Sequence, residues 1–154
     1  MIREATPQDY SAVAALANHL QETHIAARPD VLRNEMFFTP EHFQQHLENE
    51  DTNVFVYEVD GKMQGYCITK MVNYQQHMAY HDMRVCVIGA ICVCENARGK
   101  GIGRELFDHA KAHAEKCGST RIELNVWDFN KSAKEFYEHL GFTTKTSTME
   151  MNLL

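Results

Sequence analysis

The spacing of apolar positions changes along the chain, and this spacing distinguishes predicted strands from predicted helices. The longest apolar stretch, residues 85–94 (VCVIGAICVC), contains no charged side chain. At ten residues it is too short to cross a bilayer, and it is typical of a strand buried on both faces. An amphipathic helix is predicted over residues 102–117, because one side of it is apolar. Its apolar positions follow helical spacing: Ile102, Leu106, Ala110, Ala114 and Cys117.

The N-terminal part predicts one short strand and two helices. Residues 1–4 form the strand, and Thr6-Pro7-Gln8-Asp9 then supplies an N-cap residue, an early proline and a capping acid. This helix is expected to end before Pro29, because the residue preceding a proline is pushed out of helical geometry. Thr39-Pro40-Glu41 repeats the start signal for a shorter helix. The connection over residues 24–38 is either a substrate-facing lid or a plain linker.

The remaining elements alternate between strands and helices. Residues 54–57 and 65–68 are strand-like, and Asp60-Gly61 between them is a strong hairpin signal. A polar loop is predicted over residues 73–82. Residues 121–126 alternate like a strand. A helix capped by Asn130 and stopped by Gly141 follows, and one or two terminal strands are expected up to Leu154. A strand–helix–strand unit implies a parallel pair, whereas the hairpins imply antiparallel pairing, so we expect an α/β fold with a mixed sheet.

Length and composition favour one domain over residues 1–154. A net charge of −6 argues against nucleic acid as a partner and is compatible with cationic small molecules or basic peptides. The sequence shows no signal peptide and no segment long enough to span a membrane. Five cysteines without CxxC spacing argue for reduced thiols and a cytoplasmic location. The sequence is compatible with either a monomer or a homodimer.

A glycine-rich turn, Arg98-Gly99-Lys100-Gly101-Ile102-Gly103, leads from the predicted central strand into the central helix. The first N–H groups of a helix have no internal partner, and the helix dipole places partial positive charge there. Glycines let the backbone approach a ligand closely, and Arg98 and Lys100 add two formal charges. The sequence therefore predicts an anion site, suited to phosphate groups.

Three nucleotide-binding patterns were compared with this turn. A P-loop needs a hydroxyl residue after the lysine, and none follows Lys100. The dinucleotide fingerprint needs Gly-x-Gly-x-x-Gly, whereas the turn has Gly-x-Gly-x-Gly. The third pattern, Arg/Gln-x-x-Gly-x-Gly/Ala, is met by Arg98, Gly101 and Gly103. The alternative is a glycine-rich turn without a ligand.

The third pattern resembles the pyrophosphate loop of the GCN5-related N-acetyltransferases (GNAT), which hold acetyl-coenzyme A (acetyl-CoA). A second motif is similar to what these enzymes carry after their fifth strand. It consists of Asn130, Ala133, Phe136-Tyr137 and Leu140-Gly141-Phe142. With the N-terminal strand, the resemblance covers nearly the whole chain. It implies a mixed central sheet whose parallel strand pair splays apart, flanked by about four helices, and an acyltransferase with acetyl-CoA as acetyl donor.

The resemblance also implies roles for individual residues. Asn130 would reach the arm of the cofactor, and Tyr137 would protonate the leaving thiolate; the alternative for Tyr137 is a core tyrosine. The backbone around three strand residues would bind the pantetheine amides: Ile91, Cys92 and Val93. The turn would bind the pyrophosphate through six residues: Arg98, Gly99, Lys100, Gly101, Ile102 and Gly103.

The chain departs from the family at Val87, eleven residues before Arg98, where several members carry a glutamate as general base. The sequence offers four other candidates for the base: Glu35, His24, His81 and Asp82. Glu35, His81 and Asp82 are also expected to face the acceptor. The predicted acceptor is a primary amine on a small cationic molecule or basic peptide. Acidic side chains in the segments expected to face it favour this choice: Glu22, Asp30, Glu35 and Asp82.

Two alternatives concern the function class and metal binding. An acetyl-CoA-binding sensor or scaffold of the same fold would bind the donor without efficient transfer. Three histidine pairs have a spacing of four that can share a metal on a helix: His42/His46, His77/His81 and His109/His113. None has a recognisable third ligand, so no metal site is predicted.

Overall fold

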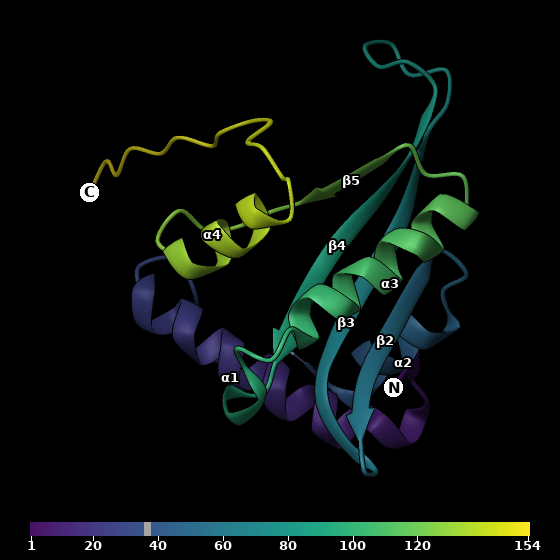
Figure 1. Ribbon diagram of the computed structural model, residues 1–154. Helices are drawn as coiled ribbons and strands as arrows, with labels where there is room; N and C mark the ends of the chain where they lie inside the picture. Colours follow the sequence, from purple (N-terminus) through teal and green to yellow (C-terminus); the bar gives the residue numbers. More distant parts are fainter. Residues whose placement is uncertain (36–37) are drawn as a thin grey trace.

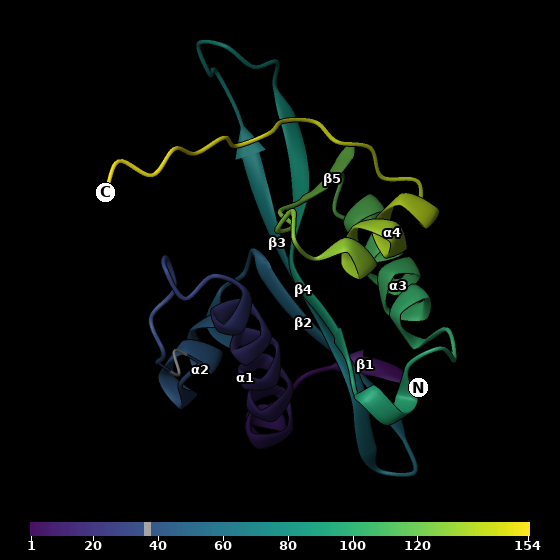
Figure 2. The same cartoon turned by 90° about the vertical axis from the view of Figure 1, so that its left-hand side faces the viewer.

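The computed structural model describes residues 1–35 and 38–154 and shows a five-stranded sheet between two layers of helices (Figures 1 and 2). The strands lie in the sheet in chain order: β1 (Ile2–Glu4), β2 (Thr52–Val59), β3 (Lys62–Tyr74), β4 (Met83–Val93) and β5 (Arg121–Leu124). The first four strands pair antiparallel, and β4 pairs parallel with β5. The predicted α/β fold with a mixed sheet is confirmed.

Two helices cover each face of the sheet (Figure 2). α1 (Tyr10–Ala27), which follows a 3-10 turn at Pro7–Asp9, and α2 (Pro40–Glu48) pack on one face. α3 (Ile102–Lys116) and α4 (Lys131–His139) lie on the other face. Each face has its own apolar cluster, so the sheet is buried between two cores.

Local signals explain where these elements begin and end. Thr39 Oγ1 accepts a hydrogen bond from the His42 amide at 3.1 Å and starts α2. Asn130 Oδ1 accepts one from the Ala133 amide at 3.2 Å and starts α4. Asp60 and Gly61, both with positive φ, form the turn between β2 and β3. α1 ends at Ala27, before Pro29, as predicted.

The prediction of terminal strands near the C-terminus is wrong. Residues 143–154 form neither helix nor strand and are exposed, and they follow α4 as an extended trace (Figure 1). Met149, Met151 and Leu153 alternate with polar residues as in a strand, yet they are 93%, 83% and 88% exposed. A strand requires a neighbour for its backbone N–H and C=O groups, and this segment pairs with none of the described strands.

Two general properties of the chain follow from the side chains and helix lengths. All five cysteines carry free thiols. Among the helices in the described part of the chain, none combines the length and the apolar character that a membrane span needs.

Candidate active site

The site begins where β4 and β5 separate. Their pairing runs from Val85 opposite Arg121 to Ile88 opposite Leu124, whereas β4 continues to Val93. Within the described residues, β4 beyond Ile88 therefore has a strand partner on its β3 side only. Backbone groups of residues 91–93 that do not bond β3 point into this gap. The predicted splayed pair is confirmed, with Ile91, Cys92 and Val93 along the gap.

A bulge explains why the strands diverge. On β3, consecutive residues Ile68 and Thr69 face Ala90 and Ile88, so Gly89 is an additional residue on β4. A bulge bends the strand that carries it and increases its local twist. β4 therefore turns away from β5 directly after their last pair.

The glycine-rich turn lies at the end of the gap. Gly99 and Gly101 adopt φ values of 75° and 84°, in the left-handed region that favours glycine. Gly101 caps α3 without a side-chain hydrogen bond, and the first helical bond runs from the Glu105 amide to the Gly101 carbonyl at 3.0 Å. The amides of residues 102–104 therefore lie before the first intrahelical bond. Uncapped amides and a glycine backbone fit an anionic group such as a pyrophosphate.

Arg98 and Lys100 contribute charge to this turn, and Arg98 also ties it to the strand. Its Nε donates to the Val93 carbonyl at 3.2 Å, and both cationic side chains are exposed. The structure thus brings the predicted pyrophosphate residues next to the predicted pantetheine residues.

Gly103 has a packing role that the sequence did not reveal. A Cβ atom there would lie 3.2 Å from Cζ of Phe136 on α4. The glycine therefore allows the first turn of α3 to approach α4 closely.

Tyr137 lies on α4, and its phenol is close enough to Cys67 and Cys92 to interact with them electrostatically. Burial raises the pKa of its phenol to about 12, and the nearby thiols of Cys67 and Cys92 act in the same direction. These two cysteines lie on β3 and β4, so the phenol reaches toward the centre of the sheet. Its ring contacts Phe142 with centroids 5.7 Å apart. Asn130 caps α4 through its side-chain oxygen, so a bond to a cofactor would have to come from its amide nitrogen.

The other predicted site residues lie apart from one another and from the glycine-rich turn. His81 and Asp82 lie in the β3–β4 loop, which joins β4 at the end opposite the glycine-rich turn, roughly 34 Å away along the strand. Asp82 accepts a hydrogen bond from the Gln76 amide at 3.0 Å. Glu35 is exposed in the connection between α1 and α2. His24 packs against Phe129, and burial lowers its pKa.

A cavity of about 330 Å³ lies between α2 and the sheet, and sequence reasoning missed it. Val87 and Gly89 line it from β4, at the start of the gap. Its other lining residues come from α2, its C-terminal flank, β2 and β3: His42, Gln45, His46, Asn49, Thr52, Ile68 and Lys70. The sequence signal for it is the spacing of four between His42 and His46, which by itself suggests only a shared metal.

The two histidines contact each other at this cavity. His46 Nε2 lies 3.2 Å from His42 Nε2, and the ring planes are inclined at 81°. Burial lowers the pKa of His46, and the charges of His42 and Lys70 lower it further. No group of three or more metal-ligating side chains occurs among the described residues.

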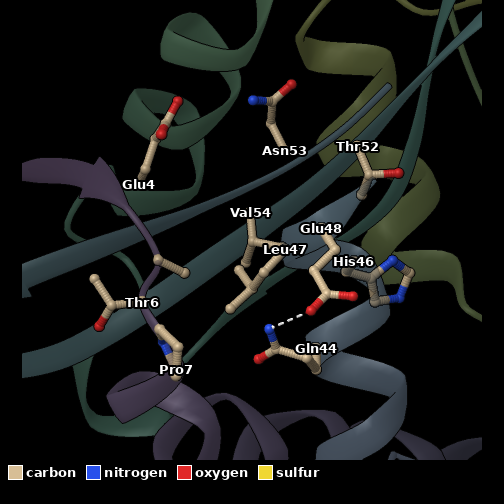
Figure 3. Close-up of a pocket in the computed structure, with 11 residues that line it drawn as sticks. Glu4, Thr6, Pro7, Gln44, His46, Leu47, Glu48, Thr52, Asn53 and Val54 are labelled. Atoms are coloured by element: carbon tan, nitrogen blue, oxygen red, sulfur yellow. Dashed lines mark hydrogen bonds between the residues drawn. The ribbon is translucent and has the colours of Figure 1, made fainter. Parts of the chain in front are cut away.

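A second cavity, of about 270 Å³, lies on the other side of His46 between α2, the N-terminal strand and β2 (Figure 3). Gln44 donates to Glu48 at 2.8 Å across its α2 wall. This cavity includes residues of β1 and β2, but none of β4. It therefore lies away from the gap, although His46 and Thr52 line both cavities.

Comparisons with known proteins agree with this geometry. The family model described as acetyltransferase (GNAT) family matches residues 13–142. The chain is 28% identical over 145 residues to the uncharacterized N-acetyltransferase YhfO of Bacillus subtilis (strain 168), covering 94% of this chain and 91% of that protein. It is 26% identical over 144 residues to the 5-NmdU N-acetyltransferase of Pseudomonas phage PaMx11, covering 93% and 86%.

A solved structure shares the whole fold. A mutant of the BH1408 protein from Bacillus halodurans superposes with a TM-score of 0.96 at 36% identity, covering 100% of this chain and 99% of that one. The predicted class of enzyme, an acyltransferase, is confirmed at the level of the family. This chain belongs to the acetyltransferase (GNAT) family.

Proposed function

We propose that this enzyme transfers an acetyl group from acetyl-CoA to a primary amine by direct attack of the amine. The observation that carries the proposal is the end of β4–β5 pairing at Ile88 and Leu124, because the gap leads directly to an uncapped helix N-terminus. Relatives named N-acetyltransferases support nitrogen as the acceptor atom.

The donor site is proposed along β4 and the turn. The backbone of Ile91, Cys92 and Val93 holds and orients the pantetheine amides. Arg98, Lys100 and the amides of residues 101–103 hold the pyrophosphate, and the amide nitrogen of Asn130 contacts the arm of the cofactor. When bound, acetyl-CoA supplies an acetyl thioester.

Tyr137 is proposed to donate a proton to the leaving sulfur. Its raised pKa, about 12, would weaken it as an acid toward a thiol in water, whose pKa is about 8.5. Burial also raises the pKa of thiols here, to about 12 for Cys67 and about 11 for Cys92. A thiolate buried at the same place should also become more basic, which favours transfer of the phenol proton to the sulfur.

The proposed acceptor is a small cationic molecule or basic peptide that carries the attacking amine. The net charge of −6 raises the local concentration of cations. Inside the 330 Å³ cavity, however, Lys70 disfavours an ammonium group. The attacking nitrogen therefore enters as the neutral amine, whereas the other cationic groups of the acceptor stay outside.

The single-domain organisation over residues 1–154 belongs to the same proposal, because one continuous sheet supplies both core clusters and the gap. The free thiols suit a reducing compartment such as the cytoplasm.

Donor binding is tested by thermal unfolding with acetyl-CoA. At a hundredfold excess over Kd, binding adds about 2.7 kcal/mol to the free energy of unfolding, which raises Tm by several degrees. Lys100→Glu reverses a charge in the turn and should remove most of this rise. Lys111→Glu makes the same charge change on an exposed site farther along α3 and should retain it. If millimolar acetyl-CoA did not change the Tm of the wild-type protein, the proposal would be contradicted.

Transfer is tested by thiol release with polyamines, aminoglycosides, lysine peptides and neutral amines at two ionic strengths. Cationic acceptors should give the highest kcat/KM, and salt should lower it. Donor binding without thiol release for any amine would instead favour a sensor or scaffold.

A further inference from the structure

We infer that the cavity between α2 and the sheet holds the acceptor, and that His46, paired with His42, accepts the proton of the attacking amine. This inference rests on the proposed function and supplies the base that Val87 cannot provide. It assigns a catalytic role to an α2 residue rather than to the central strand.

The position of the cavity is the first argument. Gly89 lines it and is the first β4 residue beyond the last β4–β5 pair. The three atoms nearest to a Cβ atom placed at Gly89 all belong to Ile68 on β3, the closest at 3.7 Å. Because Gly89 carries no side chain, an amine in the cavity can pass along β4 at this residue to the start of the gap.

The histidine pair is the second argument. His46 Nε2 faces His42 Nε2 at 3.2 Å, so one of these nitrogens must donate and the other must accept. A proton taken up by His46 can be shared with His42, whereas a second proton would place two like charges in contact. The pair therefore accepts one proton and resists a second. The ring of Phe38 lies beside the His46 ring, with centroids 6.5 Å apart and planes inclined at 24°.

The surroundings of His46 keep its imidazole in the neutral form before the reaction. On α2 the titratable neighbours are His42 and Glu48, and Lys70 lines the same cavity from β3. Glu4 of β1 lines the second cavity together with His46, but its side chain points away from the histidine (Figure 3). Burial is the largest cause of the lowered pKa of His46, and His42 and Lys70 add to the shift. The imidazole is therefore neutral at pH 7 and free to take a proton.

The lone pair of the amine nitrogen forms the bond to the acetyl carbon, and the carbon–sulfur bond breaks. The amine proton passes to His46, and the sulfur receives the proton of the Tyr137 hydroxyl. His46 then releases its proton to solvent, and Tyr137 regains one from solvent. An amide and a thiol replace the amine and the thioester, with no oxidant or reductant.

The kinetic test compares His46→Gln with His109→Gln, which makes the same substitution at an exposed histidine on α3. His46→Gln retains polarity and size but cannot take up a proton. It should lower kcat about a hundredfold and leave the Tm rise with acetyl-CoA unchanged. His109→Gln should behave like the wild-type enzyme in both measurements.

The pH profile separates proton transfer from packing. With a weakly basic acceptor that stays neutral throughout, kcat/KM of the wild-type enzyme should fall as the pH drops through the lowered pKa of His46, below the ordinary range for histidine. This acidic limb should be absent in His46→Gln. A variant that keeps the wild-type rate and the wild-type limb would overturn the inference.

Nitrogen-15 NMR of the histidine rings gives a readout without turnover. His46 should titrate below the ordinary range for histidine, and His42→Gln should move its titration to higher pH, because one opposing charge is lost. Adding a primary amine without donor should shift the His46 signals and leave those of His109 in place. Unresponsive His46 signals would overturn the acceptor site. Failure of the proposed function is distinguishable, because the wild-type enzyme would then show neither donor binding nor thiol release.

Discussion

At the scale of single residues, Arg3 holds the N-terminus to the sheet. Its guanidinium contacts both carboxylate oxygens of Asp9, at 2.8 and 2.9 Å, and Glu58 at 2.7 Å. This bidentate contact is the main cause that lowers the pKa of Asp9 to about 2. Asp9 also accepts from the Thr6 amide at 2.8 Å, so one carboxylate joins β1 to the start of α1.

Asp9→Asn should lower the free energy of unfolding by about 2 kcal/mol at pH 7, because the pKa falls from 3.8 to about 2 on folding. Since the folded-state pKa is depressed, this stability is present above pH 3.8 and is lost as pH falls toward 2. Urea unfolding of both proteins at pH 7 and pH 2.5 should show the difference shrinking. The control Asp108→Asn removes an exposed pair with Arg104 and should change stability little.

Tyr137→Phe should lower kcat about a hundredfold, because it removes the proposed acid and little contact area. The Tm rise with acetyl-CoA should stay nearly unchanged. Tyr80→Phe, in the exposed β3–β4 loop, is the matched control and should keep full turnover. Equal turnover of Tyr137→Phe and the wild-type enzyme would show that Tyr137 only packs.

At the scale of elements, α2 matters most because it carries His42 and His46. Its start depends on one side chain, the Thr39 hydroxyl that accepts from the His42 amide. Thr39→Ala should therefore cost about 1 kcal/mol of stability in urea unfolding. Thr39→Ser keeps the hydroxyl and should cost much less. Equal losses for the two variants would mean that the threonine methyl group, rather than the cap, stabilises the helix.

Sequence predicted the elements well because their signals are local. Thr39-Pro40, Asp60-Gly61 and Asn130 each act within a few residues, and each stands where the structure begins an element or a turn. The glycine-rich turn was predictable for the same reason.

The parts of the site that depend on contacts between distant segments were not predictable. The cavity exists because Phe43 docks α2 on the sheet and brings His46 opposite Lys70. The role of Gly103 depends on Phe136, thirty-three residues later. The prediction of terminal strands was wrong because an alternating pattern does not reveal whether the segment pairs with the edge of a sheet.

At the scale of the whole molecule, residues 143–154 form an arm held by few contacts. Glu150 pairs with Arg28 at 2.7 Å, and Lys145 pairs with Glu123. Beyond these contacts, Met149, Met151, Leu153 and Leu154 are exposed. The outer edge of β5 has no partner among the described strands. An alternating apolar segment and an open sheet edge on the same chain suit pairing between two copies.

We therefore expect a homodimer in which each arm adds a strand to its partner. Sedimentation equilibrium should show twice the monomer mass, and deletion of residues 148–154 should give monomers that remain folded. Met78→Glu, at an exposed methionine in the β3–β4 loop, should leave the dimer intact. A full-length chain that stays monomeric at high micromolar concentration would contradict this expectation.

The chain order of the strands has a consequence for folding kinetics. Closing a loop costs more entropy as the loop lengthens, so the β2–β3 hairpin, with its two-residue turn, closes most cheaply. The gap forms only after α3 has carried the chain across to place β5 beside β4. We therefore expect the proposed acetyl-CoA site to be completed late in folding, after the barrier that limits the rate. A bound donor should accordingly slow unfolding and leave the refolding rate nearly unaltered, so that the substrate prolongs the lifetime of the native enzyme.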